Sequence, residues 1–382
     1  MADLVGLLGI RVQLFISGMD APPLPAPFDV VDSLISLQVT NNDRERDGFQ
    51  MEFSLGKDSL LDYGLLRSGI LDFKKRVIIM AVFGALPQVL IDGIITKHQV
   101  VPSNEPGRST LHVTGEDISV KLSFEDQSLT HPNQSDSDIV KKILDDAGFR
   151  FLSEVTDTSD TPSDAERIST QQCNHLSYIQ HLAQRNGFIF YVEPTHIPGV
   201  NTAYWGKEKR EGQSQPPLSL NMGPQTNVDA PINFSLNALG PAEPEVSIID
   251  PLTKLPIPIP LPNSFFPSLT SQPSKPLRKT KSRDSAQLSY AQALLKALTA
   301  ATDSSGVVEA NGEVDAVRYG RALRARRLVD VQGAGQSYSG TYYVKQVVHN
   351  IRLLPRGEYK QSFTLIREGR GASGTSVAPE SS

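Results

Sequence analysis

The stretch LSYIQHLAQRNGFIFYVEP (residues 176–194) changes its hydrophobic period halfway along, and this change decides the fold class. Its apolar residues at helical spacing are Leu176, Ile179, Leu182 and Ala183. Asn174 is suited to cap the start of this helix, and Gly187 to take the left-handed position at its end. The run FIFYV then follows as a strand. Residues 176–194 are therefore predicted to form a helix-plus-strand unit.

The segment SDSDIVKKILDDAGF (residues 135–149) repeats the same design. Ser135 or Ser137 can accept backbone N–H bonds as an N-cap, and Asp136 and Asp138 suit the positive end of the helix dipole. Gly148 is placed to end this helix. Two such units predict a compact α+β domain in the middle of the chain.

Strand patterns dominate on both sides of this middle part. In GFQMEFSLG (residues 48–56) apolar and polar residues alternate, whereas RVIIMAVFG (76–84) is apolar on both faces, as in a fully buried strand. After residue 325, LVDVQG, GTYYVKQVVHNI and GEYKQSFTLIRE read as strands, joined by the turns GAGQSYSG and LLPRG. The predicted fold class is α+β, mainly β, with two tube-type β-barrel domains separated by a smaller α+β insertion.

Residues 241–276 hold ten of the 27 prolines, a pattern that favours an extended linker or wrapping loop. Its apolar side chains, Ile257 among them, are expected to lie against a surface. Residues 285–302 are predicted to form an amphipathic helix. The expected division is 1–118, a first tube-like β domain; 119–240, the insertion with a return to the tube; 241–284, the proline-rich stretch; 285–370, a helix plus the second tube-like β domain; and 371–382, a disordered tail.

The composition is that of a globular protein, with 39% hydrophobic residues and a net charge of −5. The N-terminus lacks the basic start of a signal peptide, and the longest apolar run is too short to span a bilayer, so no membrane insertion is expected. Charge is uneven, however. Residues 316–370 hold 11 Lys and Arg against 3 Asp and Glu, a local net charge of +8. This asymmetry indicates a surface that meets an acidic partner, or one neutralised by the rest of the chain.

Cys173, His175 and His181 lie close enough in sequence to be candidates for a metal or nucleophile site. Six residues of helix turn through 600°, which is 240° past a full turn, so the two histidines do not converge. Cys173 has no sequence signature of an orienting base, and a structural cysteine explains it better. The run VDVQGAGQSY lacks the third glycine and the following helix of a dinucleotide loop. No enzyme, no metal site and no cofactor is predicted.

The segment RYGRALRARRL gathers five arginines within ten residues: Arg318, Arg321, Arg324, Arg326 and Arg327. They can form a solvated or interface-facing stripe, or can track a phosphate backbone. A nucleic-acid-binding module using the basic 316–370 face is therefore the alternative function. A hydrolase with an unrecognised site near Cys173 or Ser337 is a third hypothesis.

Two series of residues in the C-terminal hairpin carry a family resemblance. They are Gly340, Tyr342, Tyr343, Val344, Val347 and His349, and then Tyr359, Gln361, Phe363, Leu365 and Arg367. With the two middle helix units and the run 224–259, they resemble, in the same order, the late control D family of contractile-tail hub proteins. That family includes baseplate hubs of tailed phages and of phage-derived contractile injection systems.

The resemblance implies a structural symmetry adaptor. It would be a homotrimer whose paired tube-like domains make a pseudo-hexameric ring joining the inner tube to the central spike. The implied partners are the inner tube ring, a spike protein, baseplate wedge proteins, and cargo or a tape-measure protein in the lumen. Because the chain ends shortly after the second β-unit, the spike is expected to be a separate polypeptide. Assembly would occur in the bacterial cytoplasm, and the protein would then sit in the baseplate of a phage tail-like particle.

Six residues are the interface candidates: Arg318, Arg321, Arg324, Tyr342, Val344 and Val347. The arginines are expected to meet an acidic rim. Tyr342 and Val344 lie on one face of their strand and Val347 on the other, so both faces look buried. Such burial is expected to need packing on a neighbouring subunit or on the insertion domain.

Overall fold

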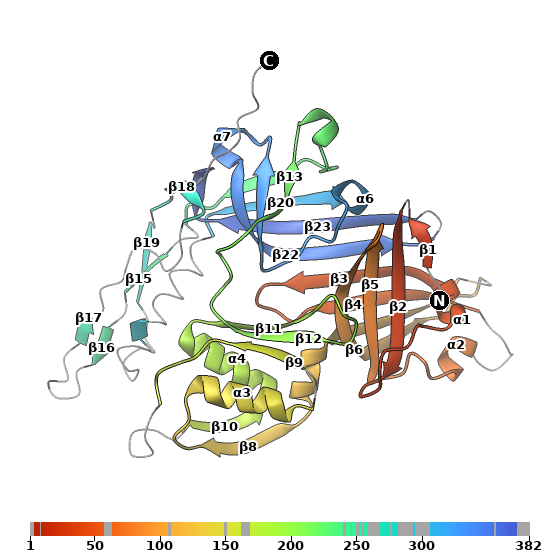
Figure 1. Ribbon diagram of the computed structural model, residues 1–382, viewed down its shortest axis with the longest axis horizontal. Helices are drawn as coiled ribbons and strands as arrows, with labels where there is room; N and C mark the ends of the chain where they lie inside the picture. Colours follow the sequence, from red (N-terminus) through yellow and green to blue (C-terminus); the bar gives the residue numbers. More distant parts are fainter. Residues whose placement is uncertain are drawn as a thin grey trace.

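The structure is a computed structural model of the whole chain (Figure 1). It describes residues 4–7, 9–56, 63–105, 108–148, 151–161, 169–239, 242–245, 247–249, 253, 256–258, 268–275, 277–281, 293–294, 306–354 and 357–372. The predicted helix at 285–302 and the predicted disordered tail lie almost wholly outside these residues.

One large sheet runs through both predicted β-units. Its path is β1-β2-β5-β6-β7-β4-β3-β22-β23-β20-β14, and β13 and β21 branch from β22. Its strands are β1 (Leu4–Leu7), β2 (Ile10–Gly18), β3 (Leu34–Asn42), β4 (Gly48–Leu55), β5 (Lys75–Phe83), β6 (Leu86–Val101), β7 (Ser109–Asp117), β13 (Gln215–Ser219), β14 (Asn233–Leu236), β20 (Val308–Asp315), β21 (Leu328–Gln332), β22 (Gly340–Arg352) and β23 (Glu358–Arg367). The protein is α+β and mainly β, as predicted.

The two β-units meet at the antiparallel pair β3·β22. The ladder runs from Gln346 opposite Asn42 to Arg352 opposite Ser36. We call this ladder the seam. Sequence patterns predicted two separate barrels; the described strands instead form one open path that passes through the seam. The units are therefore joined edge to edge by backbone hydrogen bonds.

Alternation along the strands explains the cores of the two units. In β4, Phe49, Met51, Phe53 and Leu55 are buried, and the polar residues between them face the other way. β5 is buried almost throughout, as its continuous apolar run predicted, because Val77 and Ile79 face one cluster and Ile78 and Met80 another.

The insertion lies below the sheet in Figure 1 and has its own core. Its elements are η1 (Ile118–Ser123), β8 (Asp126–His131), α3 (Asp136–Asp146), β9 (Phe151–Val155), β10 (Ser169–Asn174), α4 (His175–Asn186), β11 (Ile189–Pro194) and β12 (Asn201–Gly206). Ser135 caps α3 by accepting from Asp138 N, and Asn174 caps α4 by accepting from Ser177 N. Gly187 adopts φ 71° at the end of α4. These predicted caps are confirmed.

The remaining elements are short: α1 (Phe28–Ser33), α2 (Gly64–Arg67), η2 (Gly223–Gln225), β15 (Ala242–Glu245), β16 (Ser247–Ile249), β17 (Pro256–Pro258), β18 (Thr270–Pro273), β19 (Arg278–Lys281), α6 (Ala316–Tyr319), α7 (Gly335–Tyr338) and β24 (Gly369–Ala372). The helix α7 lies where a plain turn was predicted. In the proline-rich stretch, Ile257 is 44% exposed, so this side chain is covered only in part. Ile259, Leu261, Phe265 and Phe266 lie outside the described residues.

Candidate functional site

Three glutamines from distant parts of the chain hold the backbone of residues 321–324. The consecutive N–H groups of Ala322, Leu323 and Arg324 donate to the side-chain oxygens of Gln88 (2.6 Å), Gln361 (2.6 Å) and Gln215 (2.8 Å), respectively. The amide nitrogens of Gln361 and Gln215 donate in turn to the carbonyls of Arg321 and Arg324, both at 2.9 Å. We call residues 321–324 the arginine loop. Its backbone is fixed by β6, β13 and β23 together.

The arginine loop forms one wall of a groove of about 990 Å³, which we call the arginine groove. It is lined by Pro87, Gln88, Glu193, Pro194, Thr195, His196, Thr202, Gln213, Ser214, Gln215, Pro216, Pro217, Arg321, Ala322, Arg324, Arg327 and Asp330. Ala322 and Leu323 are buried and anchor the loop, whereas the side chain of Arg321 is exposed. The groove thus lies between the first β-unit, the insertion and the second β-unit.

The predicted interface arginines divide between two places. Arg321 and Arg324 line the arginine groove, with the side chain of Arg324 half-buried. Arg318 lies outside it, on α6, where its exposed side chain pairs with Asp229 at 2.6 Å. Arg327, on the groove wall, lies 3.5 Å from Glu193. The structure brings two of the three candidates together.

Arg326 differs from its arginine neighbours because it is buried inside the chain. Its guanidinium donates to the two carboxylate oxygens of Asp47 at 2.6 and 3.1 Å, and lies over the ring of Tyr191 at 4.3 Å. Asp47 belongs to the first β-unit, and Tyr191 to β11 of the insertion. We call this contact the three-way joint. Sequence reasoning missed it, because Arg326 looks like every other arginine in the run.

A second carboxyl shares the three-way joint. The side chain of Asp117 accepts from Asp47 N at 3.1 Å and from Ser119 N at 2.8 Å. Burial, and then the negative charge of Asp47, raise the pKa of Asp117 to about 7. Burial beside the carboxylate of Asp47 therefore favours the protonated form of Asp117 up to about neutral pH.

Tyr342, Val344 and Val347 are fully buried within the single chain. They pack in the core of the second β-unit with Leu365 and other apolar residues. Their neighbour Tyr343 packs against Leu269 and Leu328, and Ile351, at the far end of the same strand, belongs to the core of the first β-unit. The start of β22, Tyr342 to Val344, is buried on both faces, as expected, but the chain's own β-units cover it. Beyond it the expectation is wrong: an irregularity between Val344 and Gln346 puts Val347 on the same face as Val344, and Val348 is only half-buried. A neighbouring subunit is not needed for this burial.

Cys173 lies at the end of β10 and packs against the core of the insertion. His175 Nδ1 lies 3.2 Å from Gln171 Nε2, and burial lowers the pKa of this histidine. No set of three or more His, Cys, Asp or Glu side chains in the described part of the chain is grouped as metal ligands would be. The stretch that decides the fold is a packed joint of the insertion.

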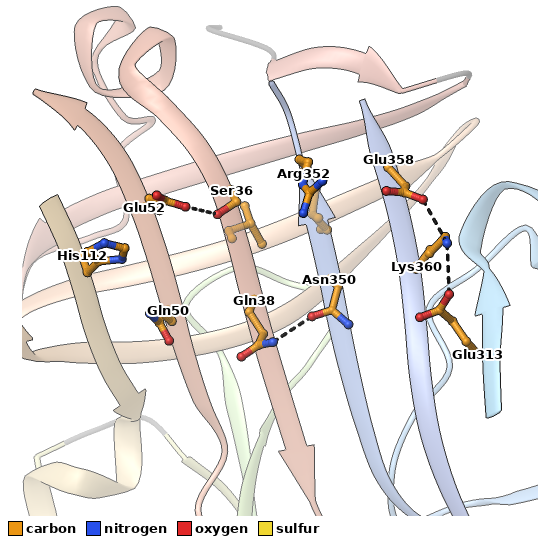
Figure 2. Close-up of a pocket in the computed structure, with 12 residues that line it drawn as sticks. Ser36, Gln38, Gln50, Glu52, His112, Glu313, Asn350, Arg352, Glu358 and Lys360 are labelled. Carbon is orange, nitrogen blue, oxygen red and sulfur yellow. Dashed lines mark hydrogen bonds and ion pairs between the residues drawn. The ribbon is translucent and has the colours of Figure 1, made fainter. Parts of the chain in front are cut away.

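A second concavity, of about 300 Å³, crosses the seam on the polar face of the sheet (Figure 2). We call it the polar trough. In Figure 2, Gln38 of β3 donates to Asn350 of β22 at 2.8 Å, and Lys360 of β23 bridges Glu358 and Glu313. Since Ser36 likewise donates to Glu52 at 2.9 Å, many polar groups of the trough already satisfy one another.

Among the described helices, none is long and apolar enough to cross a bilayer. Comparison with known proteins mainly identifies the fold of this chain. A family model described as "Alg8 N-terminal domain" matches residues 64–209, which is less than half of the chain. No curated protein matches the sequence.

Solved structures similar to this chain include phage tail proteins. The tail protein from Neisseria meningitidis has a TM-score of 0.62 at 12% identity, covering 94% of this chain and 97% of that one. The 43 kDa tail protein of prophage MuSo2 from Shewanella oneidensis gives 0.62 at 12%, covering 94% and 98%. A type VI secretion component from E. coli, described as similar to T4 tail proteins gp27 and gp5, gives 0.55 at 13%, covering 91% and 77%. The chain therefore has the fold of phage tail and type VI secretion proteins.

Proposed function

We propose that this protein is a structural baseplate hub of a contractile injection system or phage tail. Three copies would form a pseudo-hexameric ring in which each chain supplies two tube-like β-units, within residues 1–118 and 285–370. The observation that carries the proposal is the fold match to tail proteins over 94% of the chain. The seam supports it, since one chain offers two β-units in a fixed relation, as a three-to-six symmetry adaptor requires.

The proposed partners are the inner tube ring on one side and a separate spike protein on the other. Baseplate wedge proteins would surround the ring, with cargo or a tape-measure protein in its lumen. Assembly would take place in the bacterial cytoplasm before incorporation into the particle. A non-enzymatic role agrees with the use of Cys173 and His175 in packing and hydrogen bonding.

Light scattering coupled to size-exclusion chromatography tests the ring. The full chain, co-expressed with its proposed tube and spike partners, is expected to elute as a complex with three copies of the hub. Electron microscopy of particles carrying a tagged hub should place the tag between tube and spike. Particles of normal form from a strain lacking this chain would overturn the proposal.

The nucleic-acid alternative draws less support from the contacts of the basic segment. Arg326 is committed to Asp47, and Arg318 and Arg327 each lie against a carboxylate. Of the five arginines, only Arg321 and Arg324 have no ion pair within the described part of the chain. Two cations make a small contribution compared with the 6–10 phosphate contacts of strong backbone binding.

A further inference from the structure

The arginine groove is a built site, because the backbone that carries Arg321 and Arg324 is held by bonds that do not involve their charges. Each of three successive N–H groups in the arginine loop is bonded to a glutamine from a different strand. In the described part of the chain the guanidinium groups of Arg321 and Arg324 form no ion pair within 4.0 Å, and the carboxylate that acts most strongly on Arg324 is that of Glu193. A loop fixed before binding loses little conformational freedom when a ligand arrives.

The charges of the arginine groove favour a ligand with separated negative groups. Arg321, Arg324 and Arg327 contribute three positive charges, and Glu193 and Asp330 two negative ones. A continuous polyanion would meet both carboxylates. A ligand whose carboxylates are spaced by neutral groups can contact the arginines without placing a negative charge beside Glu193 or Asp330.

The rest of the lining favours a peptide over a nucleic acid. None of the residues that line the groove is Tyr, Phe or Trp, so His196 is the one aromatic side chain in the lining on which a base could stack, whereas binding of a single strand uses a series of such platforms. Four prolines, Pro87, Pro194, Pro216 and Pro217, give it rigid apolar walls without N–H donors. Such walls suit the side chains of an extended polypeptide.

We propose that the arginine groove binds an extended acidic peptide segment of a partner protein, with Arg321 and Arg324 receiving its carboxylates. The inference rests on the proposed function only for the source of the segment, which would be another component of the particle. Paired guanidinium–carboxylate bonds are charge-assisted and set both affinity and register.

Fluorescence anisotropy of the purified full chain tests this with a labelled peptide of alternating Glu and Ser, about 12 residues long. Matched probes are the Lys/Ser peptide and an oligothymidylate of the same length. The Glu/Ser peptide is expected to bind the wild type best, and more weakly as salt rises, because exposed charges are screened over about 10 Å at 0.1 M salt.

Variants locate the binding. Arg321→Gln, at an exposed position, is expected to raise the Kd by about tenfold, the loss of one charge-assisted hydrogen bond, and the Arg321→Gln/Arg324→Gln pair by more. Arg318→Gln, a matched exposed arginine outside the groove, should change it less than about twofold. Gln215→Ala keeps every arginine but frees the loop, and should weaken binding with no change in net charge.

Equal affinity of the wild type and the double variant overturns the inference, as does failure of the Glu/Ser peptide to bind at about 0.05 M salt. Tighter binding of the oligothymidylate also overturns it, in favour of the nucleic-acid alternative. Light scattering on the same samples separates the two proposals. A trimer that does not bind the peptide supports the proposed hub and contradicts peptide binding by the arginine groove. A chain that binds the peptide but does not trimerise with its partners supports the groove and contradicts the hub.

Discussion

Arg326 and Asp47 form a buried ion pair between residues 279 positions apart, with two hydrogen bonds of 2.6 and 3.1 Å. Arg326 is 3% exposed and Asp47 is 1% exposed. The pair connects the first β-unit to the segment just before β21. Because Tyr191 covers the guanidinium, the insertion is fixed at the same point.

Breaking this pair on one side should destabilise the protein strongly. Arg326→Gln leaves the carboxylate of Asp47 buried without its counter-charge, which typically costs about 3–5 kcal/mol. Urea unfolding followed by circular dichroism measures the loss. The control is Arg108→Ala, which removes an exposed pair with Glu105 and should cost less than about 1 kcal/mol. Similar midpoints for the two variants would show that the three-way joint contributes little.

Stability should fall as pH rises from about 4 to about 7, because of Asp117. Its pKa is raised from 3.8 to about 7 in the folded protein, chiefly by burial. Between these values the folded state binds more protons than the unfolded state, so ionisation of Asp117 costs folding free energy. The contribution of protonated Asp117 to the free energy of unfolding is complete below about pH 4 and has been lost by about pH 7.

The variant Asp117→Asn isolates this contribution, since it cannot ionise. Its midpoint of thermal unfolding should change less between pH 5 and pH 8 than that of the wild type. A wild type that becomes more stable over this range, or a variant with the same pH dependence as the wild type, would show that Asp117 is not the group that binds the proton.

Val344→Asp should prevent stable folding, and with it any assembly. Val344 is fully buried, and an unpaired carboxylate there costs several kcal/mol. Val317→Asp makes the same chemical change on α6, where the side chain is 37% exposed, and should fold normally. Soluble yield and limited proteolysis compare them. Normal particles containing Val344→Asp would contradict the packing described for β22.

Cys173→Ser should leave both stability and particle function unchanged within error. The thiol is half-buried beside the core of the insertion, and the proposed role gives it no reaction to perform. Injection activity and particle counts test the variant together. Intact particles that fail to inject would reveal a chemical role for Cys173.

Local features of this fold could be read from the sequence, because their causes lie within a few residues. The caps Ser135 and Asn174 and the helix end at Gly187 are determined by neighbouring backbone groups. The same holds for the two-sided burial of β5, which needs only a continuous apolar run. For β22, two-sided burial was predicted along the strand but holds only from Tyr342 to Val344, because an irregularity after Val344 changes which residues share a face. The covering elements are the chain's own β-units, which the alternation of residues does not identify.

Long-range pairing explains what the sequence could not reveal. Nothing near β3 specifies β22 as its partner, and nothing in the arginine run distinguishes the buried Arg326 from the exposed Arg321. That difference comes from Asp47, and from a backbone turn at Arg326 with φ 62°. The three glutamines of the arginine loop likewise act over 38 to 234 positions, which no local pattern records.

The seam also determines the order in which parts of the protein can fold during synthesis. Gln38 of β3 and Asn350 of β22 are 312 positions apart, so the first β-unit leaves the ribosome long before its edge partner exists. At roughly 5–20 residues per second the edge of β3 waits on the order of 15–60 seconds. During that time its free N–H and C=O groups can pair with another nascent chain. Slow translation or crowded polysomes should therefore favour exchange of β22 between copies.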